Sequence, residues 1–524
     1  MKPFDSKGTF LPVLNHGELR SRSVRSAGVT VFSQGLMFAI QLAATLVLAR
    51  LLTPADFGVV TMVSTFSLLL VGFGLNGFTE AVLQRDEINH PLISNLFWIN
   101  IGAGLLLATA FAASGTLLAS LYKDSRVAHV AVGMSIAIFV SGSSVLHLAL
   151  LKRAMQFMTA SGADVAGRTV SVALSIFLGW TGWGYWALVA GAIVQPLVVS
   201  LVAFWACRWL PGLPRRVPGT VQVVRYALHV YGRYCFSYTT RNTDNLLVGW
   251  RFGTEALGLY KKAYDLFLLP ATQLVAPVTG VAISALSRLN DNVEEYKRSF
   301  LNGLGMLAFL GMGLGAGLTI AGADLMRVVL GPGWEMSGRI FTLFGPGMGI
   351  MVVYNANGLI HLSIGSADRW FRWGIIEFSV TVVFFLLALH WGPMGLAVAW
   401  TASFWVLVAP AFWYAGRPIN LGVAVVFAAT WRFIVASFLA GYATATIIKH
   451  TSWLVAASGT PGAALRVVAD SIIFGILYVG SVILLHGGIA PVAKFYSLLK
   501  DALPSRTRRA VADVEVVAPA RVGL

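Results

Sequence analysis

Apolar stretches of about twenty residues recur along the chain from Ala27 to His486, and short polar connections separate them. A helix of that length spans the hydrocarbon core of a bilayer, whereas a membrane β-strand needs about half as many residues. The pattern therefore predicts an all-α integral membrane protein with about fourteen transmembrane helices. The predicted spans are 27–49, 58–80, 92–115, 127–150, 164–182, 184–207, 229–250, 257–280, 300–322, 338–360, 373–391, 393–414, 421–446 and 463–486.

Short sequence similarities between the two halves predict an internal repeat. Three pairs of segments match in order along the chain, with offsets of roughly 200 residues. Each match is weak alone, but three in register predict a parallel duplication of a six-helix bundle, with the repeat axis along the membrane normal. The pairs are 50–58 with 251–258, 81–85 with 284–288, and 182–187 with 392–397.

The longest polar connection contains Pro211, Pro214 and Pro218 and divides the first twelve predicted spans six and six. We interpret it as a linker between two bundles, with two helices appended to the second. The predicted organisation is a basic N-terminal arm at 1–26, an N-lobe at 27–207, the linker at 208–228, a C-lobe at 229–414, two further spans at 415–490 and a tail at 491–524.

The distribution of charge predicts the orientation in the membrane. The chain is 57% hydrophobic and 11% charged, and it carries 38 Lys and Arg residues. If the N-terminus is cytoplasmic, most of these basic residues lie in cytoplasmic connections and in the tail, as the positive-inside rule requires. We therefore expect both termini, the arm and the linker to be cytoplasmic. Cytoplasmic loops that lie against anionic membrane lipid are the simplest explanation of the net charge of +16, which therefore requires no nucleic-acid partner.

Common catalytic and cofactor motifs are missing from the sequence. There is no Walker A sequence and no G-x-S-x-G, and the nine histidines lack metal-ligand spacing. The glycine-rich run 311–317 lies inside a predicted span with no strand before it, which favours close helix packing over a dinucleotide loop. We predict no enzyme activity, no metal and no cofactor.

One face of the predicted seventh span is polar and aromatic. A positive charge near the middle of a span costs ~2.5–3.5 kcal/mol on insertion scales, so this face must meet protein or water. Two interpretations stay open: Arg241 and Asp244 neutralise each other three residues apart, or the face lines a hydrated cavity. The residues at three- and four-residue steps are Tyr231, Tyr234, Tyr238, Arg241 and Asn245, with Asn242 and Asp244 beside them.

Two adjacent lysines, Lys261 and Lys262, lie on the predicted outer side, against the general charge bias. They either snorkel to the interface or form a basic wall for an anionic substrate. Other spans carry single polar residues, each more often an interhelical hydrogen bond than a ligand contact. Together with the seventh span, they suggest a hydrated cavity between the bundles. These residues are Thr30, Gln34, Gln41, Thr45, Glu80, Tyr354, Asn357, His361, Glu377 and Arg432.

Three stretches carry a resemblance to a known family. Leu51–Gly58 with Gly72–Gly77, and Asp244–Tyr260 in the second half, resemble polysaccharide transporters. These are flippases of the multidrug/oligosaccharidyl-lipid/polysaccharide exporter superfamily, and the sequence is similar to the colanic-acid and exopolysaccharide members. The resemblance covers roughly residues 20–490.

The resemblance implies two six-helix lobes around a central cavity that alternates between inward-open and outward-open states. It implies a lipid-linked oligosaccharide, carried on undecaprenyl pyrophosphate across the bacterial inner membrane for exopolysaccharide or lipopolysaccharide biosynthesis, with a polymerase or export machinery as a further partner. The last two spans would shelter the lipid tail. The resemblance implies that pyrophosphate or acidic sugars would meet Arg241, Lys261 and Lys262. It implies that sugars would contact Gln34, Gln41, Tyr234, Tyr238, Asn242 and Asn357. The candidates for binding a coupling proton or sodium ion are Asp244, Asp265 and Glu80.

Two other functions fit parts of the pattern. A cation-coupled multidrug exporter shares the architecture, but such exporters favour an acidic cavity, and here the conspicuous intramembrane charges are mostly basic. A polysaccharide polymerase or ligase has similar hydropathy but typically carries a large catalytic loop outside. No predicted outer connection in this sequence is long enough for such a loop.

Overall fold

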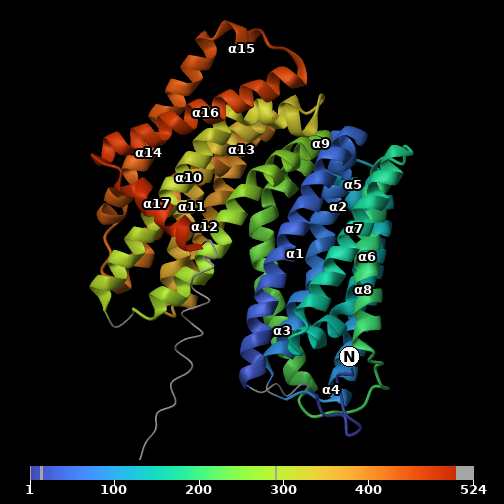
Figure 1. The fold of residues 1–524 in the computed structure, drawn as a ribbon. Helices are drawn as coiled ribbons and strands as arrows, with labels where there is room; N and C mark the ends of the chain where they lie inside the picture. The colour runs from blue at the N-terminus through green and yellow to red at the C-terminus, as the bar shows by residue number, and fades with distance from the viewer. Residues whose placement is uncertain (1, 12–15, 86, 290–291, 503–524) are drawn as a thin grey trace, which may run out of the picture. The chain divides into compact units, whose positions relative to one another are not determined.

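The computed structural model describes residues 2–11, 16–85, 87–289 and 292–502 (Figure 1). Within these ranges the regular structure is helical, apart from isolated β-bridges that involve the N-terminal segment. The prediction of an all-α chain is therefore confirmed.

Local sequence signals explain where helices begin. Thr53 precedes α2, and its hydroxyl accepts the backbone N–H of Asp56 at 3.3 Å, while the Asp56 carboxylate accepts the Thr53 N–H at 2.9 Å. This capping box is followed by Pro54, whose missing N–H has no helical partner to lose. The helices of the first half are α1 (His16–Leu51), α2 (Pro54–Gly72), a π-helical segment (Phe73–Phe78), α3 (Thr79–Gln84), α4 (His90–Ala113), α5 (Gly115–Tyr122), α6 (Arg126–Arg153), α7 (Phe157–Trp180), α8 (Tyr185–Cys207) and α9 (Thr220–Ser287).

The helix α9 contains the predicted seventh and eighth spans. It is interrupted at Gly253, where φ is 83° and ψ is −172°. Glycine adopts this conformation without a Cβ clash, so a sharp change of direction is possible there. The remaining helices are α10 (Val293–Leu330), α11 (Glu335–Ser363), α12 (Ala367–Ala388), α13 (Gly392–Gly416), α14 (Val423–His450), α15 (Ser452–Ala456), α16 (Gly459–His486) and α17 (Ala490–Ala502).

The helices support a multi-pass membrane protein. Ten helical stretches of the described chain are long and apolar enough to cross a membrane. The stretch Asp368–Ile419 contains two of the predicted spans, whereas α7 and α9 are not among the ten stretches. The count of fourteen spans stays a prediction.

The chain divides into two compact units. Unit 1 comprises Met1–Asp265, Met326–Ile340 and Val382–Ala399, and unit 2 comprises Leu266–Leu325, Phe341–Thr381 and Trp400–Leu524. The predicted lobes and the predicted linker boundaries stay predictions.

The core of unit 1 forms around α6, which contacts α2, α4, α5 and α8. Phe78, Leu96 and Leu146 are almost fully buried in this core. Beside it, the non-helical residues 208–217 between α8 and α9 are held to α4. The Asn95 side chain forms two hydrogen bonds with the backbone of Arg215, at 2.5 and 2.9 Å.

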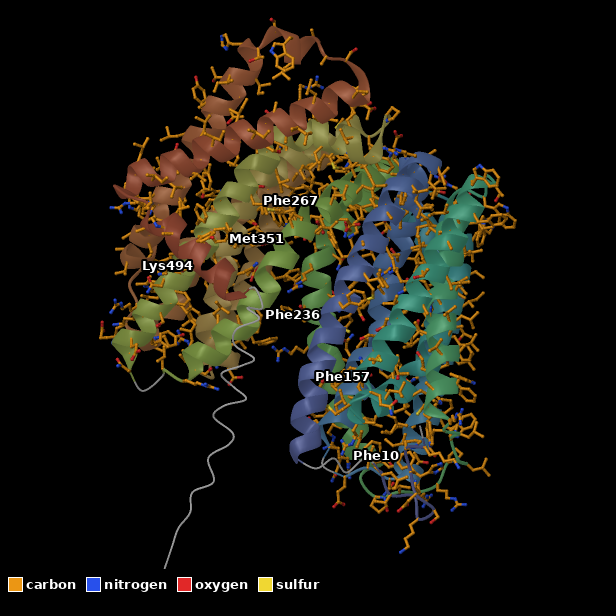
Figure 2. All side chains as sticks on the ribbon, in the orientation of Figure 1. Phe10, Phe157, Phe236, Phe267, Met351 and Lys494 are labelled. Carbon is orange, nitrogen blue, oxygen red and sulfur yellow. The ribbon has the colours of Figure 1, made fainter. Side chains whose placement is uncertain are left out.

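The core of unit 2 contains two aromatic clusters. Phe267 packs against the rings of Phe344 and Trp400, with centroids 5.2 and 5.3 Å away. Figure 2 labels Phe267 together with Met351 of α11, which is also buried. In the second cluster, Tyr478 of α16 stacks on Phe309 of α10 and donates its hydroxyl to the Phe309 carbonyl at 2.6 Å.

Candidate functional site

The tyrosines of α9 pack this helix against α2 within unit 1. The Tyr231 hydroxyl donates to the Leu69 carbonyl at 3.1 Å. The Tyr234 ring fills the space left by Gly72, because a Cβ on that glycine would lie 2.1 Å from the ring. Tyr238 continues the row, 5.7 Å from the Tyr234 centroid. Of the two tyrosines predicted to meet sugars, Tyr234 therefore also has a packing role.

Asp244 is bound by partners other than Arg241. Its side chain is buried, and its carboxylate accepts the Tyr260 hydroxyl at 3.0 Å and the Asn245 N–H at 2.8 Å. Tyr260 lies beyond the break at Gly253, so the contact ties the two segments of α9 together. The interpretation that Asp244 and Arg241 neutralise each other is not supported, because the structure places no ion pair between them.

Arg241 is exposed on α9, within the predicted seventh span. It forms no hydrogen bond or ion pair with the residues that the structure describes. Its neighbour Asn242 is half-buried and donates to the Tyr238 carbonyl at 2.9 Å, while accepting from the Asn245 amide at 3.1 Å. The guanidinium thus keeps its donors available, whereas the amides beside it are held within the helix.

The two adjacent lysines have different surroundings. The Lys261 ammonium donates to the Asp265 carboxylate at 2.7 Å, an i,i+4 pair on the surface of α9. The Lys262 ammonium lies 3.9 Å from the centroid of the Phe57 ring on α2, a cation–π contact. Lys261 is therefore neutralised by Asp265, whereas Lys262 forms no ion pair with a carboxylate of the described residues.

The remaining predicted residues belong to helices other than α9. Gln34 is exposed and Gln41 half-buried on α1, and Glu80 is exposed on α3. Asn357 belongs to unit 2, where it is buried and donates to the Tyr354 carbonyl at 2.6 Å. The side chain of Thr30 lies outside the described residues. The contacts described above join predicted residues of α9 to partners on α9 itself and on α2.

The repeated turn segments contact each other inside unit 1. A Cβ on Gly58 would lie 1.7 Å from the Thr254 carbonyl oxygen, and a Cβ on Gly258 would lie 1.8 Å from the Pro54 carbonyl oxygen. Each glycine thus packs on the residue four positions before the other glycine. We call this reciprocal packing of Pro54–Gly58 and Thr254–Gly258 the turn contact.

Trp334, which directly precedes α11, and Ser337 in the first turn of α11 pack beside the turn contact. The buried Trp334 donates its indole N–H to the Ala49 carbonyl at 2.9 Å, and its ring lies 5.6 Å from Phe57. Ser337 donates to the Leu259 carbonyl at 2.8 Å. Three helix ends are thus joined beside Lys262, a neighbourhood that the sequence similarity of the turns did not predict.

One polar cluster in unit 2 was not predicted as a site. Arg466 of α16 forms two hydrogen bonds with Asp324 of α10, at 2.8 and 2.5 Å, and the buried Asp470 lies one helical turn beyond it. Both α16 residues fall inside the predicted fourteenth span, so their four-residue spacing was a signal available in the sequence.

The sequence is similar to a known protein family. Residues 47–338, more than half of the sequence, match the family described as "Polysaccharide biosynthesis protein". The chain belongs to this family. The resemblance to polysaccharide transporters is therefore confirmed.

Individual relatives of this polysaccharide biosynthesis protein extend the match. The teichuronic acid biosynthesis protein TuaB of Bacillus subtilis is 25% identical over 332 residues, which cover 62% of this chain and 67% of TuaB. The lipopolysaccharide biosynthesis protein WzxC of Escherichia coli is 22% identical over 396 residues, covering 74% of this chain and 78% of WzxC. Both alignments extend over most of the chain.

The fold resembles that of a solved flippase. The lipid II flippase MurJ in an inward closed conformation matches with a TM-score of 0.69 at 13% identity, covering 87% of this chain and 98% of MurJ. At this identity the likeness shows a shared fold.

Proposed function

We propose that this protein is a flippase. It moves oligosaccharide repeat units linked to undecaprenyl pyrophosphate across the bacterial inner membrane by alternating access, without catalysing a reaction. The membership of the polysaccharide biosynthesis family and the fold shared with the lipid II flippase support this function. In this proposal both termini are cytoplasmic, and the flipped units pass to a polymerase or export machinery.

The exposed guanidinium of Arg241 is the observation that carries the proposal. A cation inside a predicted span needs protein, water or an anionic ligand around it, and Arg241 has no partner among the described residues. Guanidinium donors match a pyrophosphate or an acidic sugar in a bidentate geometry. We propose that Arg241 and Lys262 meet the anionic part of the substrate, with Lys261 modulated by its pair with Asp265.

The uncharged residues have a second role in the proposal. Gln34, Gln41 and Asn242 carry amides, and the half-buried Tyr234 and Tyr238 carry aromatic rings, that can hydrogen-bond or stack on sugars. Asn357, which is buried in unit 2, is proposed for the same role. Asp244, Asp265 and Glu80 remain proposed coupling sites. The first two already have hydrogen-bond partners, so a coupling ion would compete with Tyr260 or Lys261.

The proposed function is tested by locating the lipid-linked oligosaccharides in cells that lack the protein. A membrane-impermeant sugar label is applied to intact spheroplasts, and the labelled and unlabelled pools are extracted and compared. We expect complete repeat units trapped on the cytoplasmic side, protected from the label. Complete, unpolymerised units on the outer side would instead indicate a polymerase or ligase. Unchanged glycolipids would favour drug export.

The proposed orientation makes a separate prediction about the linker. A reporter active only in the cytoplasm, fused after Arg215, is expected to be active. The same reporter fused at Thr181, between α7 and α8, is the matched control and is expected to be inactive. The reverse result at both positions would overturn the orientation derived from the charge distribution.

A further inference from the structure

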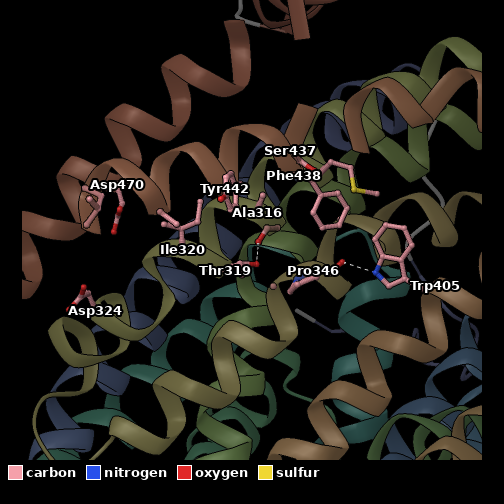
Figure 3. A pocket seen from close by; sticks show the side chains of 17 residues that line it. Ala316, Thr319, Ile320, Asp324, Pro346, Trp405, Ser437, Phe438, Tyr442 and Asp470 are labelled. Atoms are coloured by element: carbon pink, nitrogen blue, oxygen red, sulfur yellow. Dashed lines mark hydrogen bonds between the residues drawn. The ribbon is translucent and has the colours of Figure 1, made fainter. Parts of the chain in front are cut away.

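A pocket in unit 2 contains a carboxylate, that of Asp470, with an oxygen that has no hydrogen-bond partner among the described residues. The pocket has a volume of about 570 Å³ and lies among α10, α11, α13, α14 and α16. Asp324 and Asp470 lie at one end, and Trp405 and Phe438 lie at the other (Figure 3). None of its lining residues belongs to α9.

Asp470 is a buried residue in the interior of α16. It lies well inside α16, which runs from Gly459 to His486, and its exposed fraction is 5%. Its Oδ1 atom is buried and has no hydrogen-bond partner. An ionised carboxylate in such a position is costly unless it is paired or bound to a cation.

The nearby arginine does not supply that pairing. The Arg466 guanidinium donates to both carboxylate oxygens of Asp324, and its remaining contacts go to the carbonyls of Leu454 and Ala457 at 3.4 and 2.6 Å. One guanidinium therefore lies near two carboxylates but pairs with only one of them, which leaves one negative charge to be balanced at this end of the pocket.

The rest of the pocket offers no other cation. Tyr442 of α14 is the further titratable side chain in the lining, and α11 and α13 contribute Gly345, Pro346, Gly349 and Trp405. The lining hydroxyl of Thr319 already donates to the Gly315 carbonyl at 2.8 Å. Metal ions such as Ca²⁺ take six or more oxygen ligands, and no cluster of three metal-ligating side chains occurs in the described chain. A proton is the cation that these surroundings accommodate.

We propose that Asp470 is a proton-binding site and that proton release transfers Arg466 from Asp324 to Asp470. Arg466 and Asp470 are four residues apart on one face of α16, the spacing at which side chains pair along a helix. When the O–H bond of Asp470 breaks and the proton leaves to water, the new carboxylate competes for the guanidinium. The contact between α10 and α16 is then weakened, so proton occupancy is coupled to the packing of these helices.

The site is tested by infrared difference spectroscopy on the purified full-length protein in lipid. Spectra are recorded between about pH 5 and about pH 9, a range that brackets the titration of buried carboxyls. We expect a carboxylic-acid C=O band at the lower pH that disappears at the higher pH. The band should be absent in Asp470→Asn, shifted in Asp470→Glu, and unchanged in Asp368→Asn, an exposed aspartate at the start of α12.

Several outcomes would overturn the proposal. A band that persists in Asp470→Asn would show that another group binds the proton. A band that NaCl removes at constant pH, but choline chloride does not, would assign the site to Na⁺. Asp470→Glu keeps a carboxyl if Asp470→Asn fails to fold.

The transfer of Arg466 has its own test. In Asp324→Asn the guanidinium is free to pair with Asp470, which stabilises the ionised carboxyl. The midpoint of the band's titration is therefore expected to fall by about 1–3 pH units. An unchanged or higher midpoint would overturn the transfer. The spectra are recorded without substrate, so this proposal and the flippase function can fail independently, and only the use of the proton in transport rests on the proposed function.

Discussion

The variant Arg241→Ala is expected to accumulate lipid-linked repeat units on the cytoplasmic side, as the deletion does, while the protein is still inserted in the membrane. Arg241 has no partner among the described residues, so its removal breaks no internal hydrogen bond or ion pair. What is lost is a set of charged donors for an anionic substrate, whose hydrogen bonds contribute about 1.5–3 kcal/mol each. Two such bonds correspond to a fall in transport of about a hundredfold or more.

The measurement combines the impermeant-label assay with quantitation of the protein in membranes. Arg233→Ala is the matched control, because Arg233 is also an exposed arginine on α9, two turns earlier. It should retain transport, and Arg241→Lys should retain part of it because the charge is kept and the planar fork is lost. Normal surface polysaccharide in Arg241→Ala cells would remove Arg241 from the proposed site.

The variant Gly58→Ala is expected to destabilise the protein strongly. The added Cβ would lie 1.7 Å from the Thr254 carbonyl oxygen, so the backbones of the turn contact must separate. Overpacking of this kind costs typically 1–3 kcal/mol when neighbours can relax, and here the obstructing atom is backbone, which relaxes little. We expect a lower melting temperature and a loss of transport.

Gly102→Ala is the matched control for this effect. It makes the same chemical change in α4, where a Cβ would meet nothing within 4 Å. Alanine favours helix over glycine by about 1 kcal/mol, so this variant should be as stable as the parent or more stable. Thermal unfolding of the purified proteins distinguishes the two. Equal melting temperatures for Gly58→Ala and the parent would show that the turn contact is absent from the folded protein in lipid.

The helical class was predictable because it depends only on the composition and the length of the apolar stretches. Stretches of apolar residues long enough to span a bilayer can satisfy their backbone groups only as helices or closed barrels, and the length of each stretch decided for helices. Even the junction inside α9 was placed close to Gly253. The similarity of the two turn segments was also visible, because glycines and their neighbours recur at the same spacing.

The contacts were not predictable from spacing. Asp244 and Arg241 are close enough in sequence to pair, yet Asp244 bonds to Tyr260, sixteen positions later and beyond the break at Gly253. The spacing of residues along one helix does not indicate which residues come into contact after the helix changes direction. Lys261 and Lys262, expected to act together, likewise face different partners because adjacent residues on a helix point about 100° apart.

The segment 208–217, which connects α8 to α9, is held more firmly than a connection of its length suggests. Besides Asn95, Ser94 accepts the backbone N–H of Gly212 at 2.9 Å, and Trp98 donates to the Gly212 carbonyl at 2.8 Å. Residues 208–217 are therefore hydrogen-bonded along α4. The short turn at Pro218 and Gly219, where Gly219 has a φ of 86°, separates this segment from α9. A displacement of the first turn of α9 would therefore be transmitted to α4 through the side-chain hydrogen bonds of Ser94, Asn95 and Trp98.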